Sequence, residues 1–523
     1  MKLLKISFLI TGIAGIFSAL IITPEFASRY ISSDSIITPE GFEAISQLRL
    51  FSLIIGSVLL LAGLLFYRFP EDMKAFIKRP TGTTFLLICI WIFLAFINLL
   101  LKKMGIATGT PDLFPLSEFY GPRIRSAGLP YSVIFLAVLF ISLKFIKHFD
   151  VLHVWIIGLI LIFLGNLAQG GVEDAFYKPI NAPFIYLDRF FYEQYYHDAI
   201  KITDWHQWLS NFNANQKHLF LHTRTHPPFA VLLHYLFLKI SNNSLPFLAG
   251  SFILLSSLTI IIVFMIMKAL GLSKQQASLF ALLFSVVPSY NIYSSVSLDG
   301  VIVTFSALFL LGIIMLIKNR VNLVGIVLVA AGILLTNMLT FIGLFLVGTA
   351  GLIGLRELSI DKKSNILAVL FIAMLIMLTA YSCMLYFYGY NHIQAFSAVT
   401  AFEPKSLLSP ISYVMTRLEN LTMFLMFLSF GISAVFISPD YLKLRIFDLR
   451  DNINSISFAG FIPLISFLLI GGLYTGEISR IFLFLYPFFF LLLRNLEEAT
   501  LRFLIIAAGV QTIVMQTVGG YFW

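Results

Sequence analysis

The segment HTRTHPP, residues 222–228, places two histidines, an arginine and a double proline directly before an apolar run. His222 and His226 are four residues apart, so on a helix they would share a face and could bind a metal with a carboxylate such as Asp299. The double proline disfavours a helix that continues through it. The alternative is that both histidines hydrogen-bond the loop while the prolines start the next helix. A divalent cation is the one cofactor that this pattern suggests.

Acidic side chains form a second set of candidate catalytic residues. The segment 168–226 contains several of them among many aromatics: Glu173, Asp174, Asp188, Glu193, Asp198 and Asp204. Asp299 follows in SVSLDG, and Glu477 precedes Arg480 by three residues in YTGEISR. A carboxylate at an apolar boundary has a raised pKa and can act as a general base toward a hydroxyl. A departing phosphate needs a cation to take its charge, and Arg480 supplies one.

Each of these residues also has a purely structural interpretation. Asp198 could cap or solvate an interfacial helix, and Asp299 could be the N-cap of the apolar run that follows it. Glu477 and Arg480 could form an interfacial ion pair of little energetic weight. Tyr196 and its aromatic neighbours could stack on sugars, but Tyr and Trp also collect at membrane interfaces without a ligand.

The elements that carry these residues must be membrane helices. The 523 residues are 59% hydrophobic and 12% charged, with a mean hydropathy of +0.93, and apolar runs of bilayer length recur throughout the chain. We therefore predict an all-α polytopic integral membrane protein with about 14–16 transmembrane helices. The net charge of +9 comes mostly from short loops, where membrane orientation explains it, so no nucleic-acid partner is expected.

The placement of Lys and Arg predicts one topology. With the N-terminus inside, more than half of the 35 basic residues fall in short inside loops. This holds only if the apolar run 227–238 does not cross, and at about 12 residues it is shorter than the roughly 20 that a spanning helix needs. The loop acids, the histidine segment, Asp299 and the Glu477–Arg480 pair then all reach the outer side.

The chain divides into two predicted parts. Residues 1–150 form an additional N-terminal transmembrane module whose outer loops hold few candidate catalytic groups. Residues 151–523 form the catalytic module, in which 168–240 is a long outer loop with interfacial helices. No fixed-period repeat is visible.

The order of these motifs resembles the GT-C superfamily of polyprenyl-phosphate-dependent glycosyltransferases, which includes protein O-mannosyltransferases and the lipid A aminoarabinose transferase. The similarity rests on YYHDA, HTRTHPP, the SLDG hairpin and GEISR before an apolar run, and it covers residues 154–494. It implies a GT-C-like helical bundle with its active site on the extracytoplasmic face. The chain departs from the family in having no Asp-Glu pair in the expected tyrosine context.

The resemblance also implies residue roles. The base that deprotonates the acceptor hydroxyl would be Asp198, then Glu193, then Asp174 in order of preference, and Asp299 would orient the acceptor, help to bind a metal or support the loop. The substrate-binding group would comprise His222, Arg224, His226, Tyr196, Glu477 and Arg480, with Arg480 on the lipid-linked phosphate.

The sequence thus predicts a cell-envelope glycosyltransferase that moves a sugar, with inversion, from a polyprenyl-phosphate donor to a lipid, glycan or protein acceptor. A lipid or polysaccharide transporter or flippase could use the same polar groups along a pathway. Transporters more often show two related halves and charges near the membrane centre. A non-catalytic membrane assembly subunit is the third alternative.

Overall fold

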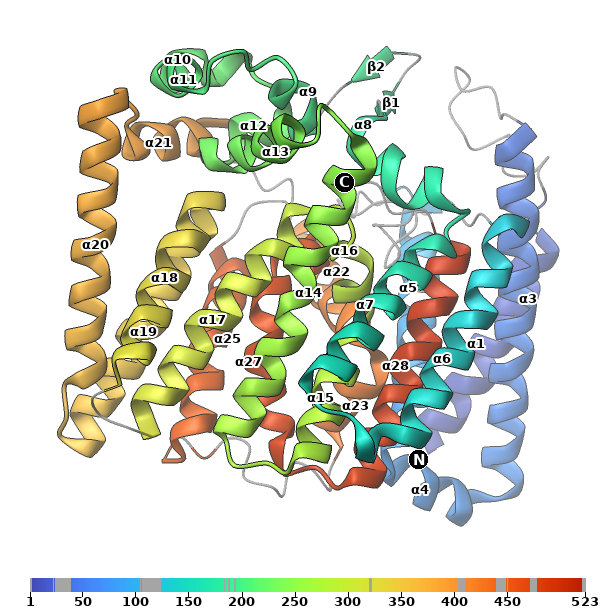
Figure 1. Ribbon diagram of the computed structural model, residues 1–523. Coiled ribbons are helices and arrows are strands. Elements are labelled where there is room, and N and C mark those ends of the chain that lie inside the picture. Colours follow the sequence, from blue (N-terminus) through green and yellow to red (C-terminus); the bar gives the residue numbers. More distant parts are fainter. Residues whose placement is uncertain are drawn as a thin grey trace.

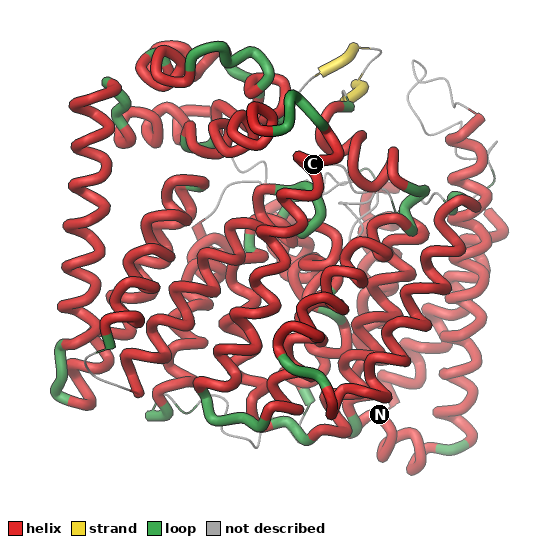
Figure 2. Tube along the Cα trace, in the orientation of Figure 1, coloured by secondary structure: helices red, strands yellow, loops and turns green. Residues whose placement is uncertain are grey.

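The computed structural model describes residues 2–21, 23, 39–103, 105, 124–182, 184–186, 189–191, 194–318, 322–402, 410–438, 448, 450–470 and 477–519. This part of the chain is helical, apart from one short hairpin in which β1 (Phe184–Tyr186) pairs antiparallel with β2 (Arg189–Phe191) (Figure 2). The predicted all-α membrane class is confirmed.

Most helices stand side by side in one bundle (Figure 1). The first part of the chain contains α1 (Lys2–Ile21), α3 (Pro39–Arg68), α4 (Pro70–Lys78), α5 (Pro80–Lys103), η1 (Ser126–Gly128), α6 (Leu129–Phe145), η2 (Ile146–His148) and α7 (Val151–Leu167). The segment that follows contains the π-helical turn η3 (Glu173–Tyr177), α8 (Lys178–Asn181), α9 (Tyr195–Ala199), α10 (Trp205–Ser210), α11 (Phe212–Asn215), η4 (Gln216–His218), α12 (Leu221–Thr225) and α13 (Pro228–Ile240).

The remainder of the chain returns to the bundle. Its first half contains α14 (Leu245–Ala269), α15 (Lys274–Ser285), α16 (Pro288–Tyr293), α17 (Leu298–Lys318), α18 (Leu323–Leu339), η5 (Phe341–Gly343), α19 (Leu344–Arg356), η6 (Glu357–Asp361) and α20 (Asn365–Tyr388). Its second half contains α21 (His392–Phe402), α22 (Pro410–Leu428), α23 (Phe430–Ile437), α25 (Asn452–Ile470), α26 (Ile478–Ile481), η7 (Leu483–Leu485), α27 (Tyr486–Leu492), η8 (Leu493–Asn495) and α28 (Glu498–Val518).

Seven helical segments of the described chain are long and apolar enough to cross a membrane. They are Ser126–His148, Leu245–Ala269, Leu298–Lys318, Phe341–Asp361, Asn365–Tyr388, Ile478–Asn495 and Glu498–Val518. The bent pair α22–α23 would make an eighth. The expected 14–16 is therefore higher than the number found in these residues. Several apolar runs fold into shorter helices, such as α7 and α18 with 17 residues each, below the roughly 20 of a full span.

Two expected continuous spans are broken. The run 277–295 divides into α15 and α16 because Pro288 has no N–H to continue the helix. The run 411–437 bends by 109° at Ser429, whose φ of 96° lies in the left-handed region. Gln511 of α28 binds the Phe430 N–H at 2.9 Å and the Met426 carbonyl at 2.7 Å, so the backbone groups freed at the bend keep partners.

Buried hydroxyls join the central helices. The hydroxyls of Thr259 in α14 and Thr304 in α17 are 2.8 Å apart, and the Tyr290 hydroxyl donates to the Ser256 carbonyl at 2.6 Å. Ser306 of α17 donates to the Phe484 carbonyl at 2.8 Å. Apolar packing gives little driving force between helices in lipid, so such small polar contacts fix which helices are neighbours.

The N-terminal helices associate through glycine. A Cβ atom at Gly12 would collide with the Leu60 backbone, and one at Gly56 would collide with the Ile16 backbone, so these glycines let α1 and α3 approach closely. The next helices pack on the rest of the bundle, with α5 against α23 and α6 against α7 and α28. The division at residue 150 into two modules remains a prediction.

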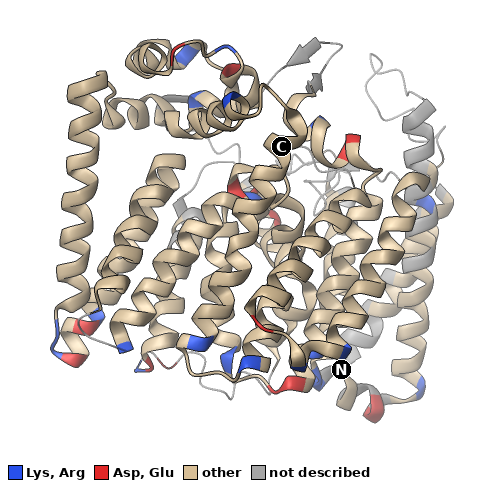
Figure 3. Cartoon of the chain, viewed as in Figure 1, with Lys and Arg blue, Asp and Glu red and all other residues tan. Residues whose placement is uncertain are grey.

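Short helices cover one end of the bundle. In Figure 1, α9–α13 and α21 lie across its upper end. The 13-residue α13 is too short to span a membrane alone, as the sequence led us to expect, and it packs on α9, α14 and α18. Lys and Arg line the opposite end (Figure 3).

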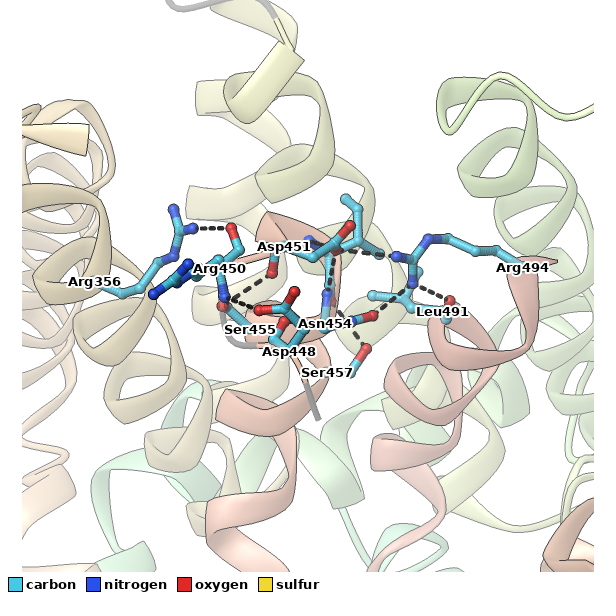
Figure 4. A network of polar contacts seen from close by, with 10 residues as sticks. Arg356, Asp448, Arg450, Asp451, Asn454, Ser455, Ser457, Leu491 and Arg494 are labelled. Atoms are coloured by element: carbon cyan, nitrogen blue, oxygen red, sulfur yellow. Dashed lines mark hydrogen bonds and ion pairs between the residues drawn. The ribbon is translucent and has the colours of Figure 1, made fainter. Parts of the chain in front are cut away.

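A polar network joins three elements at that opposite end (Figure 4). Asp451 Oδ1 caps α25 by accepting two backbone N–H groups, and it also accepts Arg494 Nη2 at 3.0 Å. Arg494 Nη1 donates to Asn454 Oδ1 at 2.9 Å, and Arg356 Nη2 donates to the Arg450 carbonyl at 2.6 Å. The network therefore fixes the start of α25 against α19 and η8.

We expect Asp451→Ala to lower the free energy of unfolding by about 0.5–2 kcal/mol, because the cap of α25 and the Arg494 contact are lost together. The measurement is thermal unfolding in one detergent, followed by intrinsic fluorescence. Asp451→Asn keeps the capping oxygen and should lose less. Equal stability of both variants and the wild type would contradict this role.

Candidate functional site

Asp299 lies in the first turn of α17, at the covered end of the bundle. Ser297 donates its hydroxyl to Asp299 Oδ2 at 2.7 Å, and the Asp299 backbone N–H donates to Ser297 Oγ at 3.1 Å. A carboxylate is stabilised at a helix N-terminus by the helix dipole. The turn thus fixes the position of the carboxylate before any ligand is present.

Arg480 joins Asp299 to Glu477. Its Nη2 donates to Glu477 Oε2 at 2.9 Å, and its Nε lies 3.4 Å from Asp299 Oδ2. Only 9% of the Arg480 side chain is exposed. The hydroxyl of Ser289 in α16 donates to the Ser479 carbonyl at 2.7 Å, which holds α26 in place. A buried guanidinium of this kind needs carboxylate partners to offset its desolvation.

Four rings gather beside this ion-pair cluster. Tyr195 of α9 is buried, and its ring centroid lies 5.7 Å from His222, 5.4 Å from His226 and 5.1 Å from His234. Burial raises the pKa of Tyr195, and the charges of Asp299 and Glu477 add to this against the effect of Arg480. The rings therefore share one electrostatic environment with the carboxylates.

The histidines of this group are held neutral. Burial and then the Arg480 charge lower the pKa of His226 to about 4, and the same two causes hold the pKa of His222 well below its usual range. His226 Nδ1 lies 3.0 Å from the His222 carbonyl and His234 Nδ1 lies 2.7 Å from the Ala230 carbonyl, so both Nδ1 atoms carry the proton. The neutral rings then keep a lone pair on Nε2.

Asp198 has different partners. It is 5% exposed, its Oδ2 accepts the Phe220 N–H at 3.0 Å, and its Oδ1 is 3.9 Å from Lys201 Nζ. Burial raises the pKa of Asp198 above its ordinary value, although the Phe220 N–H and the Lys201 charge act against burial. Asp198 is one helical turn from Tyr195 on α9, and its partners Phe220 and Lys201 are not members of the ion-pair cluster.

Asp174 is held by two cations. It pairs with Arg125, and its Oδ1 accepts Lys178 Nζ at 2.6 Å. Burial raises the pKa of Asp174, but the contacts with Lys178 and Arg125 outweigh it, so the pKa is lower than usual. A weakly basic, doubly paired carboxylate fits a structural role better than that of a general base.

The other predicted residues fall in several places. Tyr196 is half-buried and meets His197 edge-on, with centroids 5.4 Å apart. The Arg224 carbonyl accepts from Gln216 at 2.9 Å, which ties α12 to η4. Glu193 lies outside the described residues.

The suggested metal site of His222, His226 and Asp299 is not formed. In the described part of the chain, no three His, Cys, Asp or Glu side chains approach closely enough to hold a metal ion. The Arg480 guanidinium already pairs with Asp299, and its charge disfavours a second cation beside the two histidines.

Sequence reasoning counted Tyr195 only among the aromatics that could stack on sugars, and it did not select His234 as a site residue. Tyr195 and Tyr196 are adjacent, and successive helical residues point about 100° apart, so the sequence alone cannot choose between them. His234 is a lone polar residue in the apolar run of α13, which was the available signal.

The fold defines a multi-pass integral membrane protein with a buried polar cluster at one end of its helical bundle. Comparison of the chain with protein-family models, curated proteins and solved structures finds no match. The chemistry of the cluster itself is therefore the basis for assigning a function.

We expect Arg480→Met to lower the free energy of unfolding by about 3–5 kcal/mol, because Asp299 and Glu477 would be left without their cation. Unfolding of the purified protein in detergent measures it. The Arg480→Met, Asp299→Asn, Glu477→Gln triple variant should regain part of the loss. Arg502→Met, which breaks a more exposed pair with Glu498 and a hydrogen bond to the Leu143 carbonyl, should cost less, about 1–2 kcal/mol. Similar losses of unfolding free energy for both substitutions would contradict the inference that Asp299 and Glu477 depend on Arg480 as their cation.

Acid should destabilise the protein through His226. Its pKa is about 4 in the folded state and near the ordinary 6.5 when unfolded, so the unfolded chain takes up the proton first as pH falls. Stability is thus lost between pH 6.5 and 4, and His226→Gln should make this decline shallower. Unfolding midpoints measured across that range test this, with the exposed His218→Gln as control. An unchanged slope in His226→Gln would exclude the effect.

Proposed function

We propose that this protein is a membrane glycosyltransferase that transfers a sugar from a polyprenyl-phosphate donor to a hydroxyl of a lipid, glycan or protein acceptor on the extracytoplasmic face. The observation that carries the proposal is the buried Arg480 at the covered end of the bundle, held between Asp299 and Glu477. The motif order that resembles the GT-C superfamily supports it.

Arg480 has the chemistry that a lipid-phosphate leaving group requires. A guanidinium presents five N–H donors in a rigid fork that matches phosphate oxygens, and its interactions are stronger where water is excluded. Asp299 and Glu477 orient it, so they act as positioning residues. The low pKa of His222 and His226 adds to the case, because neutral rings leave Arg480 as the cation that a phosphate meets there.

The base must be a different carboxylate. In an inverting displacement the acceptor oxygen attacks the anomeric carbon from the side opposite to the departing phosphate, so the sugar lies between the base and Arg480. Asp299 is 3.4 Å from Arg480, which leaves no room for a sugar between them. Asp198 is a better candidate, because it lies one turn beyond Tyr195 and burial raises its pKa.

The reaction then proceeds in one step. Asp198 takes the proton of the acceptor hydroxyl, the acceptor oxygen bonds to the anomeric carbon, and the bond from that carbon to the phosphate oxygen breaks. The phosphate leaves with the bonding electrons, and Arg480 pairs with the charge that develops.

A transporter is the second candidate function. Charged groups on a transport path are expected near the middle of the membrane, at interrupted helices. The bend between α22 and α23 is such an interruption. Asp299, however, stands in the first turn of its helix and Arg480 in the short helix that opens its span, so both charges lie at the end of a span and not at its middle.

Transfer assays separate these functions. The purified protein is reconstituted with undecaprenyl phosphate carrying radiolabelled glucose, galactose, mannose or arabinose and with an envelope extract as acceptor. We expect sugar transfer with at least one donor. Asp198→Asn should lower its rate about 10²–10⁴-fold while donor binding is kept, because a general base contributes that much.

Arg480→Lys should weaken donor binding as well as the rate, because a lysine cannot reproduce the guanidinium fork. Arg502→Gln, which alters an exposed pair, serves as control and should leave the rate unchanged. Movement of intact sugar lipid between leaflets without any transfer would establish the transporter instead.

A further inference from the structure

A small polar pocket lies beside the ion-pair cluster. It is lined from three directions: by Asn166 and Gln169 after α7, by Ala175 and Pro179 of η3 and α8, and by residues 292, 293 and 295–297 between α16 and α17. Its volume of about 10 Å³ is close to what one water molecule or one hydroxyl group occupies. None of its lining residues is charged.

The amide side chains of the pocket are fixed in place. Asn166 Nδ2 donates to the Ile162 and Asn291 carbonyls at 2.9 and 2.8 Å. Gln169 Nε2 donates to Asn166 Oδ1 at 3.1 Å and to Gln516 Oε1 at 2.6 Å. The N–H donors of both amide groups are therefore hydrogen-bonded within the protein, and the orientation of the two side chains does not depend on a ligand.

The two serines differ in how firmly they are held. Ser297 Oγ donates to Asp299 Oδ2 at 2.7 Å, whereas the contact of Ser295 Oγ with the Ile292 carbonyl is long, at 3.4 Å. Serine oxygens keep acceptor capacity after donating, so both can accept a hydrogen bond from a ligand. The volume admits one hydroxyl group and is too small for a phosphate.

We propose that this pocket binds one hydroxyl group of the transferred sugar. The inference rests on the proposed function, and it adds a specificity site to it. Asp299 Oδ2 accepts the Ser297 hydroxyl at 2.7 Å and lies 3.4 Å from Arg480 Nε, so the pocket and Arg480 adjoin the same carboxylate. In this proposal a sugar whose anomeric phosphate lies on Arg480 extends past Asp299 and places a ring hydroxyl at the pocket. A sugar that lacks this hydroxyl would leave buried hydrogen-bond acceptors unpaired, so the pocket selects for sugars that carry it.

The test compares two adjacent serines. Ser294 and Ser295 are both buried, but only Ser295 lines the pocket. The probes are undecaprenyl phosphate and its glucose, galactose, mannose and arabinose derivatives, and binding to the full-length protein is measured in detergent. In the wild type, at least one sugar lipid should bind more tightly than the bare lipid phosphate.

Ser295→Val fills the pocket and should lower the preference for the sugar lipid over the bare lipid phosphate about tenfold. Binding of the bare lipid phosphate should be unchanged. Ser294→Ala should keep the preference. An unchanged preference in Ser295→Val would overturn the proposal and leave a site for a structural water only. An equal loss for sugar lipid and bare lipid would also overturn it, because the pocket would then be structural.

A second measurement separates this proposal from the proposed function. If no lipid phosphate binds the wild type, the proposed function fails, and the pocket is tested with free monosaccharides. Binding of each free sugar to the wild type, Ser295→Val and Ser294→Ala is then measured by calorimetry. Weaker binding to Ser295→Val than to the wild type and Ser294→Ala supports the pocket as a hydroxyl site. Equal binding to all three proteins overturns it.

Discussion

The ion-pair cluster of Asp299, Arg480 and Glu477 is the interaction on which the site depends. A guanidinium with 9% exposure is costly to bury, and two carboxylates from separate segments make its burial possible. That requirement fixes α26 against the start of α17. Burial lowers the pKa of His222 and His226, and the Arg480 charge lowers it further, so both rings beside the cluster stay neutral.

The bundle meets a second constraint, because every backbone group in lipid needs a partner within the protein. Straight helices satisfy this by themselves, and the broken ones do so with side chains from neighbours. Gln511 binds both sides of the bend at Ser429, and Ser289 holds the backbone of α26. In both places a side chain of another helix supplies the donor or acceptor that the irregular backbone needs.

The short helices over the bundle end complete the site. They bring Tyr195 and the two neutral histidines onto the ion-pair cluster, and they bury Asp198 one turn away. Burial strengthens electrostatic interactions and excludes water, which a transfer to an acceptor other than water requires. The pocket at Ser295 and Ser297 has no charged lining residue, whereas Arg480 on the other side of Asp299 is a cation, and the sugar-phosphate site that we propose would use both.

The sequence by itself determined the membrane class and the helical fold, because hydropathy reports directly on transfer into lipid. It also picked out Asp299, Glu477 and Arg480, since charges are rare in so apolar a chain. It did not show that Pro288 and Ser429 break expected spans, that Arg480 pairs with Asp299, or that Tyr195 rather than Tyr196 faces the cluster. These outcomes depend on which helices pack together and on the direction of each side chain, and contacts between residues far apart in the chain decide both.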